Sequence, residues 1–377
     1  MHVLIVNSEY PPIGGGAGNA SAHLARQLVK MGHQVTVLTA RFARLPREEI
    51  EEGVRVLRLP AARTKADRST AFEQTVFMFS AAILGLFWVG RKRPQVALAF
   101  FGVPSGAVVW FWNWFVRLPY VVCLRGGDVP GFRPYDFARQ HRLLGPLLRH
   151  VWRRAAAVVA NSEGLRQLAH QFESNVPIQV IPNGAELENY KVEGRKWQPT
   201  RLLFVGRIVY QKGLDLLLNA LGNLKNLDWQ LDLAGDGPRL EKLREHAIQL
   251  GLGERVHFLG WQSKAELLQI YRQANLFVYP SRHEGMPNAV LEAMASGLPV
   301  LASRIAGNEE LVTPETGMLF PTEDVAALQT ALKEMLLDVR VRQQMGVAGR
   351  SRVEENYSWS SVAEDYLQLM QKVVAAK

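Results

Sequence analysis

The chain has 377 residues, of which 48% are hydrophobic and 21% are charged, and its formal net charge is +9. This composition excludes a disordered or fibrous protein, and the length favours two domains over a single core. A single cysteine, Cys123, excludes an internal disulfide, so nothing points to an oxidising compartment.

The positive charge is concentrated in the first half of the chain. Residues 1–190 hold 22 Lys and Arg against 13 Asp and Glu, whereas residues 191–377 hold 22 of each kind. This asymmetry indicates an anionic partner of the first half, such as a membrane face, a phosphorylated acceptor or nucleic acid. A solvated basic surface without a partner is the alternative.

The first elements follow the order strand, glycine-rich loop, helix and strand. HVLIVN (2–7) predicts a strand, because the start lacks the basic region and long apolar run of a signal peptide. The loop SEYPPIGGGAGN precedes a helix in which Leu24, Leu28 and Met31 follow helical spacing, and Gly32 ends it. Because the start does not resemble a signal peptide and the single cysteine cannot form an internal disulfide, we expect a cytoplasmic protein.

Two stretches, 75–90 and 96–116, are unusually apolar. Both fall short of a membrane-spanning helix, which needs about 20 uninterrupted apolar residues, so a buried strand with packing helices is the favoured interpretation. The alternative is a patch on a membrane surface, in which Trp110, Trp112 and Trp114 enter the interface beside the basic residues 91–93. Alternate tryptophans do not share one helical face, so at least one must point elsewhere.

A second series of alternating strands and helices begins near residue 200. It reads RLLFVGR, GLDLLLNALGNL, WQLDLAG, RLEKLREHAIQLG, VHFLG, ELLQIYRQA, LFVYPS and NAVLEAMASG. Such alternation is typical of parallel sheets, and the polar segment 192–200 is the linker candidate. The predicted fold class is α/β, with two Rossmann-like doubly wound domains (1–190 and 200–357) facing across a cleft. A ligand would bind beyond the carboxyl ends of the strands.

The segment YPSRHEGMPNAVLEAMASG carries two glutamates, Glu284 and Glu292, around a predicted helix start near Asn288. Pro287 suits the first turn of a helix, and the free amide groups there form an anion site. Carboxylates beside such a site suit the hydroxyls of a sugar or ribose. The alternative is that they only complement the helix dipole.

Two basic residues stand in the loop FVGRIVYQKGLDLL. Arg207 follows a strand end, and Lys212 precedes a helix that starts near Leu214. A guanidinium and an ammonium group at one strand-to-helix loop suit a diphosphate.

These segments together resemble glycosyltransferase family 4, whose members are retaining enzymes of the GT-B fold with an E-x7-E motif. The resemblance covers nearly the whole chain, in order and spacing. It includes YPPIGGGAG, GHQVTVLT, ANSEGLRQLA, IPNGAELENY, FVGRIVYQKGLD, LAGDGP, GWQSKAEL and GNEELV. The C-terminal segment 358–377 resembles the family's helix that crosses back onto the first domain.

The resemblance assigns a role to each matching position. Arg207 and Lys212 would bind the donor diphosphate, Glu292 the ribose hydroxyls and Glu284 the transferred sugar. The remaining donor contacts would come from the backbone or loops at Gly15, Gly16, Gly285, Met286, Pro287 and Asn288. No metal or other cofactor is expected, and the sequence has no D-x-D motif.

One position departs from the family pattern. In VVCLRGGDVPG, Arg125 stands where many relatives have a histidine near the sugar, while Asp128 is kept. An arginine cannot act as a general base near neutral pH. It could offset the charge of the departing phosphate, hold an acidic substrate, or form a fixed ion pair with Asp128.

The predicted function is transfer of a hexose from a nucleotide-diphosphate-sugar to a glycan acceptor, expected to be lipid-linked. Its catalytic candidates are Arg207, Lys212, Glu284, Asp128 and Arg125. We also expect the protein to contact an anionic membrane peripherally, on the inner face of the cytoplasmic membrane. No nucleic-acid partner is expected, because the basic residues form no recognition element.

Two other functions stay open. A scaffold subunit that kept the fold is one. An NADP-dependent oxidoreductase is the other, since GGGAG follows the first strand and Arg41 could accept a 2′-phosphate. That glycine pattern ends on Asn19, however, and begins too far from the strand.

Overall fold

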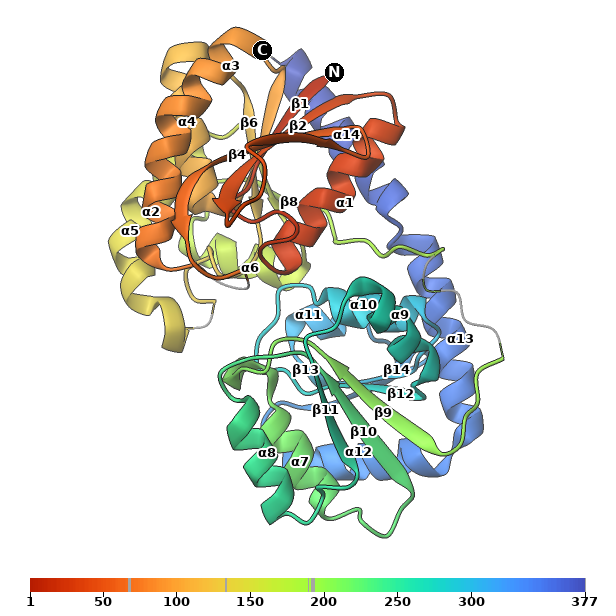
Figure 1. Cartoon of the computed structure of the whole chain (residues 1–377). Coiled ribbons are helices and arrows are strands. Elements are labelled where there is room, and N and C mark those ends of the chain that lie inside the picture. Colours follow the sequence, from red (N-terminus) through yellow and green to blue (C-terminus); the bar gives the residue numbers. More distant parts are fainter. Residues whose placement is uncertain (67–68, 133, 189, 191–193, 377) are drawn as a thin grey trace. The chain divides into compact units, whose positions relative to one another are not determined.

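A computed structural model describes the chain except for residues 67–68, 133, 189, 191–193 and 377, and except for the side chains of residues 134–137. The chain forms two α/β units, Met1–Asn183 with Trp359–Lys377 (unit 1) and Gly184–Ser358 (unit 2) (Figure 1). The sequence analysis placed residues 184–190 in the first domain. They belong to unit 2 because Ala185 and Tyr190 are buried in its core.

Unit 1 contains an eight-stranded sheet in the order β3-β4-β2-β1-β5-β6-β7-β8. Neighbouring strands are parallel, apart from β3, which is antiparallel to β4. The strands are β1 (His2–Val6), β2 (Gln34–Phe42), β3 (Glu48–Glu51), β4 (Val54–Arg63), β5 (Val96–Phe100), β6 (Tyr120–Leu124), β7 (Ala157–Ala160) and β8 (Ile178–Val180). Alternate residues of the central strands enter two different cores, one on each face of the sheet.

Helices cover both faces of this sheet. The last helix, α14, packs beside α1 over one core, where its Val362, Tyr366 and Met370 are buried. Helices α2 to α6 serve the other core. The helices of unit 1 are α1 (Gly16–Lys30), α2 (Ala71–Ser80), α3 (Leu86–Lys92), α4 (Ala107–Val116), α5 (Pro134–Arg154), α6 (Glu163–Phe172) and α14 (Trp359–Ala375), with the π-helical turns η1 (Ala81–Gly85) and η2 (Phe101–Gly106).

Unit 2 contains a six-stranded parallel sheet in the order β11-β10-β9-β12-β13-β14. Its strands are β9 (Thr200–Val205), β10 (Trp229–Ala234), β11 (Val256–Gly260), β12 (Leu276–Tyr279), β13 (Val300–Arg304) and β14 (Gly317–Pro321). Its helices are the short 3₁₀ helix η3 (Tyr210–Lys212), α7 (Leu214–Gly222), α8 (Leu240–Gln249), α9 (Lys264–Gln273), α10 (Asn288–Ala295), α11 (Ala306–Glu309), α12 (Val325–Leu337) and α13 (Val339–Asn356). The strands and helices predicted from the second half of the sequence are confirmed.

Part of the segment 192–200, which was predicted to be a linker, is bonded to unit 2. Residues 192–193 lie outside the described residues, and the segment that follows is tied to unit 2. The guanidinium of Arg195 donates to the carbonyl oxygens of Ala274 (2.7 Å) and Ser296 (2.5 Å), and Asn275 donates to that of Lys196 (2.6 Å). The division between the units instead falls at Asn183 and Gly184.

The two apolar stretches differ in structure and in burial. Stretch 96–116 forms β5, the turn η2 and helix α4; β5 is buried as predicted, whereas α4 buries one face and exposes Trp114 and Phe115. Stretch 75–90 lies in a continuous helix of 22 residues, Ala71–Lys92, which by length and composition alone could cross a membrane, the one such helix in the described chain. The sequence analysis judged this stretch too short. The helix is longer because it continues past the charge-free run at both ends.

Candidate active site

The unit 2 candidates gather at one edge of its sheet. Strands β9 and β12 are parallel neighbours, so the loops that follow them, with Arg207 and Glu284, leave the same edge. Gly213 makes their close approach feasible, since a Cβ there would lie 2.0 Å from the carbonyl oxygen of Pro280. Its φ of 64° also favours glycine. A larger residue would push the two loops apart.

Lys212 and Glu284 form a nearly buried ion pair at this edge. The Lys212 Nζ lies 2.6 Å from Glu284 Oε1 and 2.5 Å from the hydroxyl oxygen of Tyr279. The hydroxyls of Tyr279 (3.2 Å) and Ser281 (2.5 Å) also donate to Oε1, as does the Gln211 amide at 3.5 Å. Burial, with the nearby Glu284 carboxylate, raises the pKa of Tyr279 well above its ordinary value, so this hydroxyl stays a donor. The carboxylate is therefore fixed by several donors.

Arg282 holds the two loops in place. Its guanidinium donates to Asp215 (2.8 Å), to Glu323 (2.5 Å) and to the carbonyl oxygen of Tyr210 (2.7 Å), and it lies 4.0 Å from the centre of the Tyr210 ring. Sequence reasoning missed Arg282, Tyr279 and Ser281. All three belong to the segment that carries the glutamate motif, so proximity to the motif was the available signal.

Helix α10 begins at Asn288, as predicted, with Pro287 as its N-cap residue. Glu292 lies a little over one turn into the helix and accepts a hydrogen bond from the buried Tyr271 hydroxyl at 3.0 Å. Burial raises the pKa of Glu292 to about 7, against the opposing effect of the Tyr271 bond. This carboxyl group is therefore poised to change its protonation state near neutral pH.

Arg207 differs from Lys212 in its surroundings. It is exposed in the loop that follows β9 and Gly206. Within the described part of the chain its guanidinium makes no hydrogen bond or ion pair. Of the two residues predicted to bind a diphosphate, Lys212 is thus already held in position by protein groups, whereas Arg207 is exposed to solvent.

The glycine loop of unit 1 opens at the carboxyl end of β1. Helix α1 begins at Gly16, and its N-cap Gly15 donates its backbone N–H to Glu9 Oε2 at 3.3 Å. Gly14 has a φ of 94°, and a Cβ there would lie 2.5 Å from that of Glu9. A Cβ at Gly15 would meet no atom within 4 Å. The loop therefore keeps open space at Gly15 and a close contact at Gly14.

Asp128 is a backbone anchor in unit 1. Its two carboxylate oxygens accept hydrogen bonds from the backbone N–H groups of Arg125 and Gly102, each at 2.9 Å. Burial raises the pKa of Asp128, and the two backbone hydrogen bonds oppose that shift. Among the alternatives for Arg125, an ion pair with Asp128 is not the arrangement found.

The guanidinium of Arg125 is instead engaged by distant parts of unit 1. It donates to Asn183 Oδ1 at 2.6 Å and to the hydroxyl of Tyr366 on α14 at 3.2 Å. It also lies 4.3 Å from the centre of the Phe100 ring. Arg125 therefore joins the end of β6 to the C-terminal helix.

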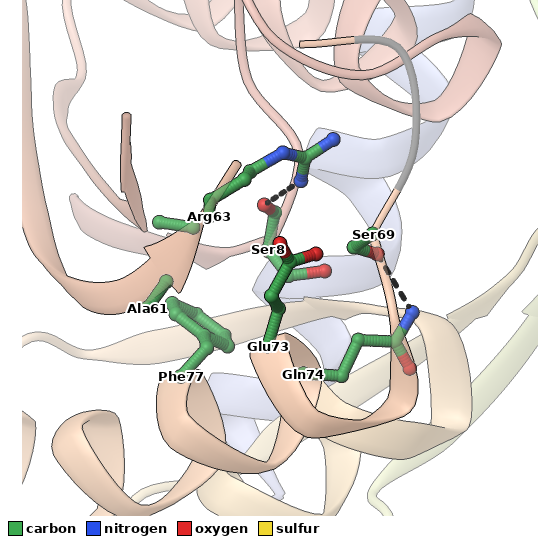
Figure 2. Close-up of a pocket in the computed structure, with 8 residues that line it drawn as sticks. Ser8, Ala61, Arg63, Ser69, Glu73, Gln74 and Phe77 are labelled. Carbon is green, nitrogen blue, oxygen red and sulfur yellow. Dashed lines mark hydrogen bonds between the residues drawn. The ribbon is translucent and has the colours of Figure 1, made fainter. Parts of the chain in front are cut away.

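A small hollow lies at the start of α2 (Figure 2). Its Glu73 accepts hydrogen bonds from the backbone N–H groups of Thr70 (2.7 Å) and Thr64 (2.8 Å) and from the Thr64 hydroxyl (2.7 Å). The Thr70 and Thr64 bonds lower the pKa of Glu73 to about 2. Arg63 donates to the carbonyl oxygen of Ala66 (3.1 Å). These polar groups form hydrogen bonds within the protein, and the bonds to Glu73 hold the start of α2 in place.

The predicted site residues fall into two groups. Arg207, Lys212, Glu284, Glu292 and the backbone of residues 285–288 belong to unit 2. Gly15, Gly16, Arg125 and Asp128 belong to unit 1. Among the described residues, no group of three or more His, Cys, Asp or Glu side chains is placed to hold a metal ion.

Two family models match the chain and meet near the division between the units. "Glycosyl transferase 4-like domain" matches residues 15–184, and "Glycosyl transferases group 1" matches residues 187–352. The chain therefore belongs to the family 4 type of glycosyltransferases, and it is a glycosyltransferase enzyme. The oxidoreductase alternative falls away.

Related sequences match over nearly the whole chain. Glycogen synthase of Mycobacterium tuberculosis is 27% identical over 96% of this chain and 92% of its own. A GDP-mannose-dependent phosphatidylinositol monomannoside mannosyltransferase of Mycolicibacterium smegmatis is 27% identical over 95% of both.

Solved structures show the same GT-B fold. Sucrose-phosphate synthase of Thermosynechococcus elongatus matches with a TM-score of 0.89, 23% identity and full coverage of both chains. HepE of Anabaena, solved in complex with UDP-glucose, matches with a TM-score of 0.80, 18% identity and full coverage of both chains.

Proposed function

We propose that this glycosyltransferase moves a hexose from a nucleoside-diphosphate-sugar to a lipid-linked glycan acceptor, with retention of anomeric configuration and without a metal ion. Support for the donor comes from the Lys212–Glu284 pair beside the start of α10. Further support is that HepE was solved in complex with UDP-glucose and that the mycobacterial relative is GDP-mannose-dependent by name.

The geometry of the ion pair fits both halves of such a donor. An ammonium group has three protons. Two of them point to Glu284 and Tyr279, which leaves one for a phosphate oxygen. The bonds to Glu284 all fall on Oε1, so within the described residues Oε2 stays open to a sugar hydroxyl. One pair can therefore orient the phosphate and the sugar together.

In the proposed transfer step, these contacts stabilise the leaving diphosphate. The bond between the anomeric carbon and the phosphate oxygen breaks while the acceptor oxygen bonds to the same face of that carbon. The acceptor's proton passes to the leaving phosphate oxygen. Arg207, Lys212 and the amide groups at the start of α10 neutralise the charge that grows on the diphosphate, and such preorganised donors are worth about 10²–10³ in rate each.

Glu292 would hold the ribose of the nucleotide. A carboxylate accepts hydrogen bonds from two neighbouring hydroxyls, and Tyr271 keeps the group in position from behind. Because burial alone favours the neutral acid, ribose hydroxyls that donate to Glu292 favour its ionised form.

The acceptor assignment rests on the basic first half of the chain and on the relative that acts on phosphatidylinositol mannoside. A lipid-linked glycan at the cytoplasmic face of a membrane, used for polysaccharide or glycolipid synthesis, fits both.

The testing experiment is a thermal-shift and hydrolysis screen with UDP-, GDP- and ADP-linked glucose and mannose. We expect one donor to stabilise the wild type and the Lys242→Ala control, whose lysine is exposed on α8, but not Lys212→Ala. Binding of no nucleotide sugar would overturn the proposal. Proton NMR of the product then reads the anomer, where an inverted product refutes retention. Full activity after chelator treatment is the outcome expected without a metal ion.

A further inference from the structure

The helix that joins β4 to β5 is apolar on its outer face as well as its inner face. The inner residues recur every fourth position and are buried: Phe77, Ala81, Gly85 and Val89. The outer residues are exposed: Phe72, Phe79, Ile83 and Phe87. A surface helix normally carries polar residues on its outer face, so this face is adapted to contact something other than water.

Helix α4 extends the exposed apolar surface. It packs directly on the helix Ala71–Lys92. The Trp112 indole donates to the carbonyl oxygen of Ala82 at 3.0 Å, and the Trp112 ring contacts Gly85. Trp112 is therefore buried, in agreement with the expectation that at least one of the three tryptophans points away from a membrane interface. Trp114 and Phe115 point outward and are exposed.

These six side chains form what we call the apolar ridge: Phe72, Phe79, Ile83, Phe87, Trp114 and Phe115. Figure 1 shows its helices α2, α3 and α4 on one side of unit 1, and they contact one another. Phe87 is 76% exposed and Trp114 is 68% exposed. Edge contacts with Trp110 and Phe111 hold the rings of Trp114 and Phe115 in place.

The ridge ends at a cluster of cations. Helices α3, α4 and α5 precede β5, β6 and β7, which are parallel neighbours, so the carboxyl ends of these helices lie along one edge of unit 1. Five exposed basic residues stand there, and we call them the basic rim: Arg91, Lys92, Arg93, Arg117 and Arg154. None of the five forms an ion pair with an acid among the described residues.

We propose that the apolar ridge and the basic rim together dock unit 1 onto the surface of an anionic lipid bilayer. Aromatic and aliphatic side chains on one helical face enter the interfacial region of a bilayer, and flanking Lys and Arg bind anionic headgroups. A rim of cations beside exposed aromatic and aliphatic side chains is the pattern that anionic headgroups above an apolar interior complement. The helix lies on the membrane and does not span it, because Phe77 and Val89 hold its inner face in the core of unit 1.

This docking surface extends the lipid-linked acceptor of the proposed function, since it would bring the enzyme to the bilayer that carries the acceptor. It is tested by binding alone, without turnover. A failed transfer assay and a failed docking surface are therefore distinguishable.

The test is flotation of the full chain with vesicles of phosphatidylglycerol and phosphatidylcholine in equal parts, against phosphatidylcholine alone. We expect the wild type to float with the anionic vesicles. Phe79→Gln with Phe87→Gln should weaken binding about tenfold or more, because both rings leave the interface. Arg91→Glu with Lys92→Glu should remove the preference for anionic lipid, as should high salt.

A matched control is Ile248→Gln with Val347→Gln, two apolar residues of unit 2 that are each 70% exposed. This control should float like the wild type. If the Phe79 and Phe87 variant has an altered near-ultraviolet spectrum, Trp114→Gln replaces it. The proposal is overturned if the wild type stays unbound, if the ridge variants bind as well as the wild type, or if sedimentation shows that the ridge instead mediates self-association.

Discussion

The two units use their charged residues differently at the carboxyl ends of their sheets. In unit 2, Lys212 and Glu284 form a compact polar cluster with Tyr279 and Ser281, and among the described residues the Glu284 Oε2 atom accepts no hydrogen bond. In unit 1, Asp128 accepts hydrogen bonds from two backbone N–H groups, and Arg125 donates to Asn183 and Tyr366. Under the proposed function, charged residues at this edge bind the donor in unit 2, whereas charged residues at the corresponding edge of unit 1 stabilise the fold.

The largest expected effect is that of Lys212→Ala on turnover. Removing the ammonium group takes away a donor to the leaving diphosphate, so the transfer rate should fall by about 10²–10³. Steady-state kinetics measure this, with Lys242→Ala as the control. The unfolding temperature should also fall, because the nearly buried Glu284 carboxylate loses its cation, so the rate is measured well below that temperature. A rate within about threefold of the wild type would place Lys212 outside the reaction.

The second effect belongs to unit 1 and concerns stability. Glu73→Ala removes the buried acceptor of Thr64 and Thr70 and should lower the free energy of unfolding by about 2 kcal/mol. The folded pKa of Glu73 is about 2, below its ordinary value of 4.5. Its contribution is therefore present above pH 4.5 and is lost as the pH falls toward 2. Chemical denaturation against pH measures both, and the variant should lack this acid dependence.

A third prediction separates the two possible roles of Arg125. If it clamps Asn183 and Tyr366, then Arg125→Lys keeps the charge but loses the forked geometry, and unit 1 should lose about 1–2 kcal/mol of stability. Hydrogen exchange in α14 should rise. The exposed Arg139→Lys on α5 serves as the control. Unchanged exchange in α14 together with reduced turnover would instead assign Arg125 to the reaction.

The smallest effect is the pH dependence of donor binding through Glu292. Its folded pKa of about 7 lies above the ordinary 4.5, so its contribution to stability is complete below pH 4.5 and is lost as the pH rises through 7. Ribose binding favours the ionised form. Affinity should therefore rise up to about tenfold between about pH 6 and 8, with release of a proton. Calorimetry in buffers of different ionisation enthalpy measures this, and Glu292→Gln should abolish it.

Much of the fold could be predicted because each element is a local pattern. Apolar residues at helical or strand spacing placed β9, α7, β12 and α10 where the structure has them. The donor-side candidates followed from their positions after strand ends. The boundary of the units was less predictable, since Ala185 and Tyr190 join unit 2 through contacts with residues distant in sequence, such as Ser358 and Tyr271.

The outer face of the helix Ala71–Lys92 shows what a local pattern leaves open. A run of apolar residues predicts burial, but the same run is compatible with a helix that buries one face only. Only 28% of its most apolar window is buried. Which residues face water depends on the sheet and on α4, and periodicity within an apolar run cannot distinguish the two faces.

By itself, the sequence determined the α/β alternation, the family and the positions of Arg207, Lys212, Glu284 and Glu292, because spacing along one chain segment sets local structure. The tertiary structure alone decided which groups meet. Lys212 pairs with Glu284 across 72 positions, and Arg125 contacts Tyr366 across 241. Such pairings depend on strand order, which places β9 beside β12 and β6 near the C-terminal helix, and no local pattern encodes that order.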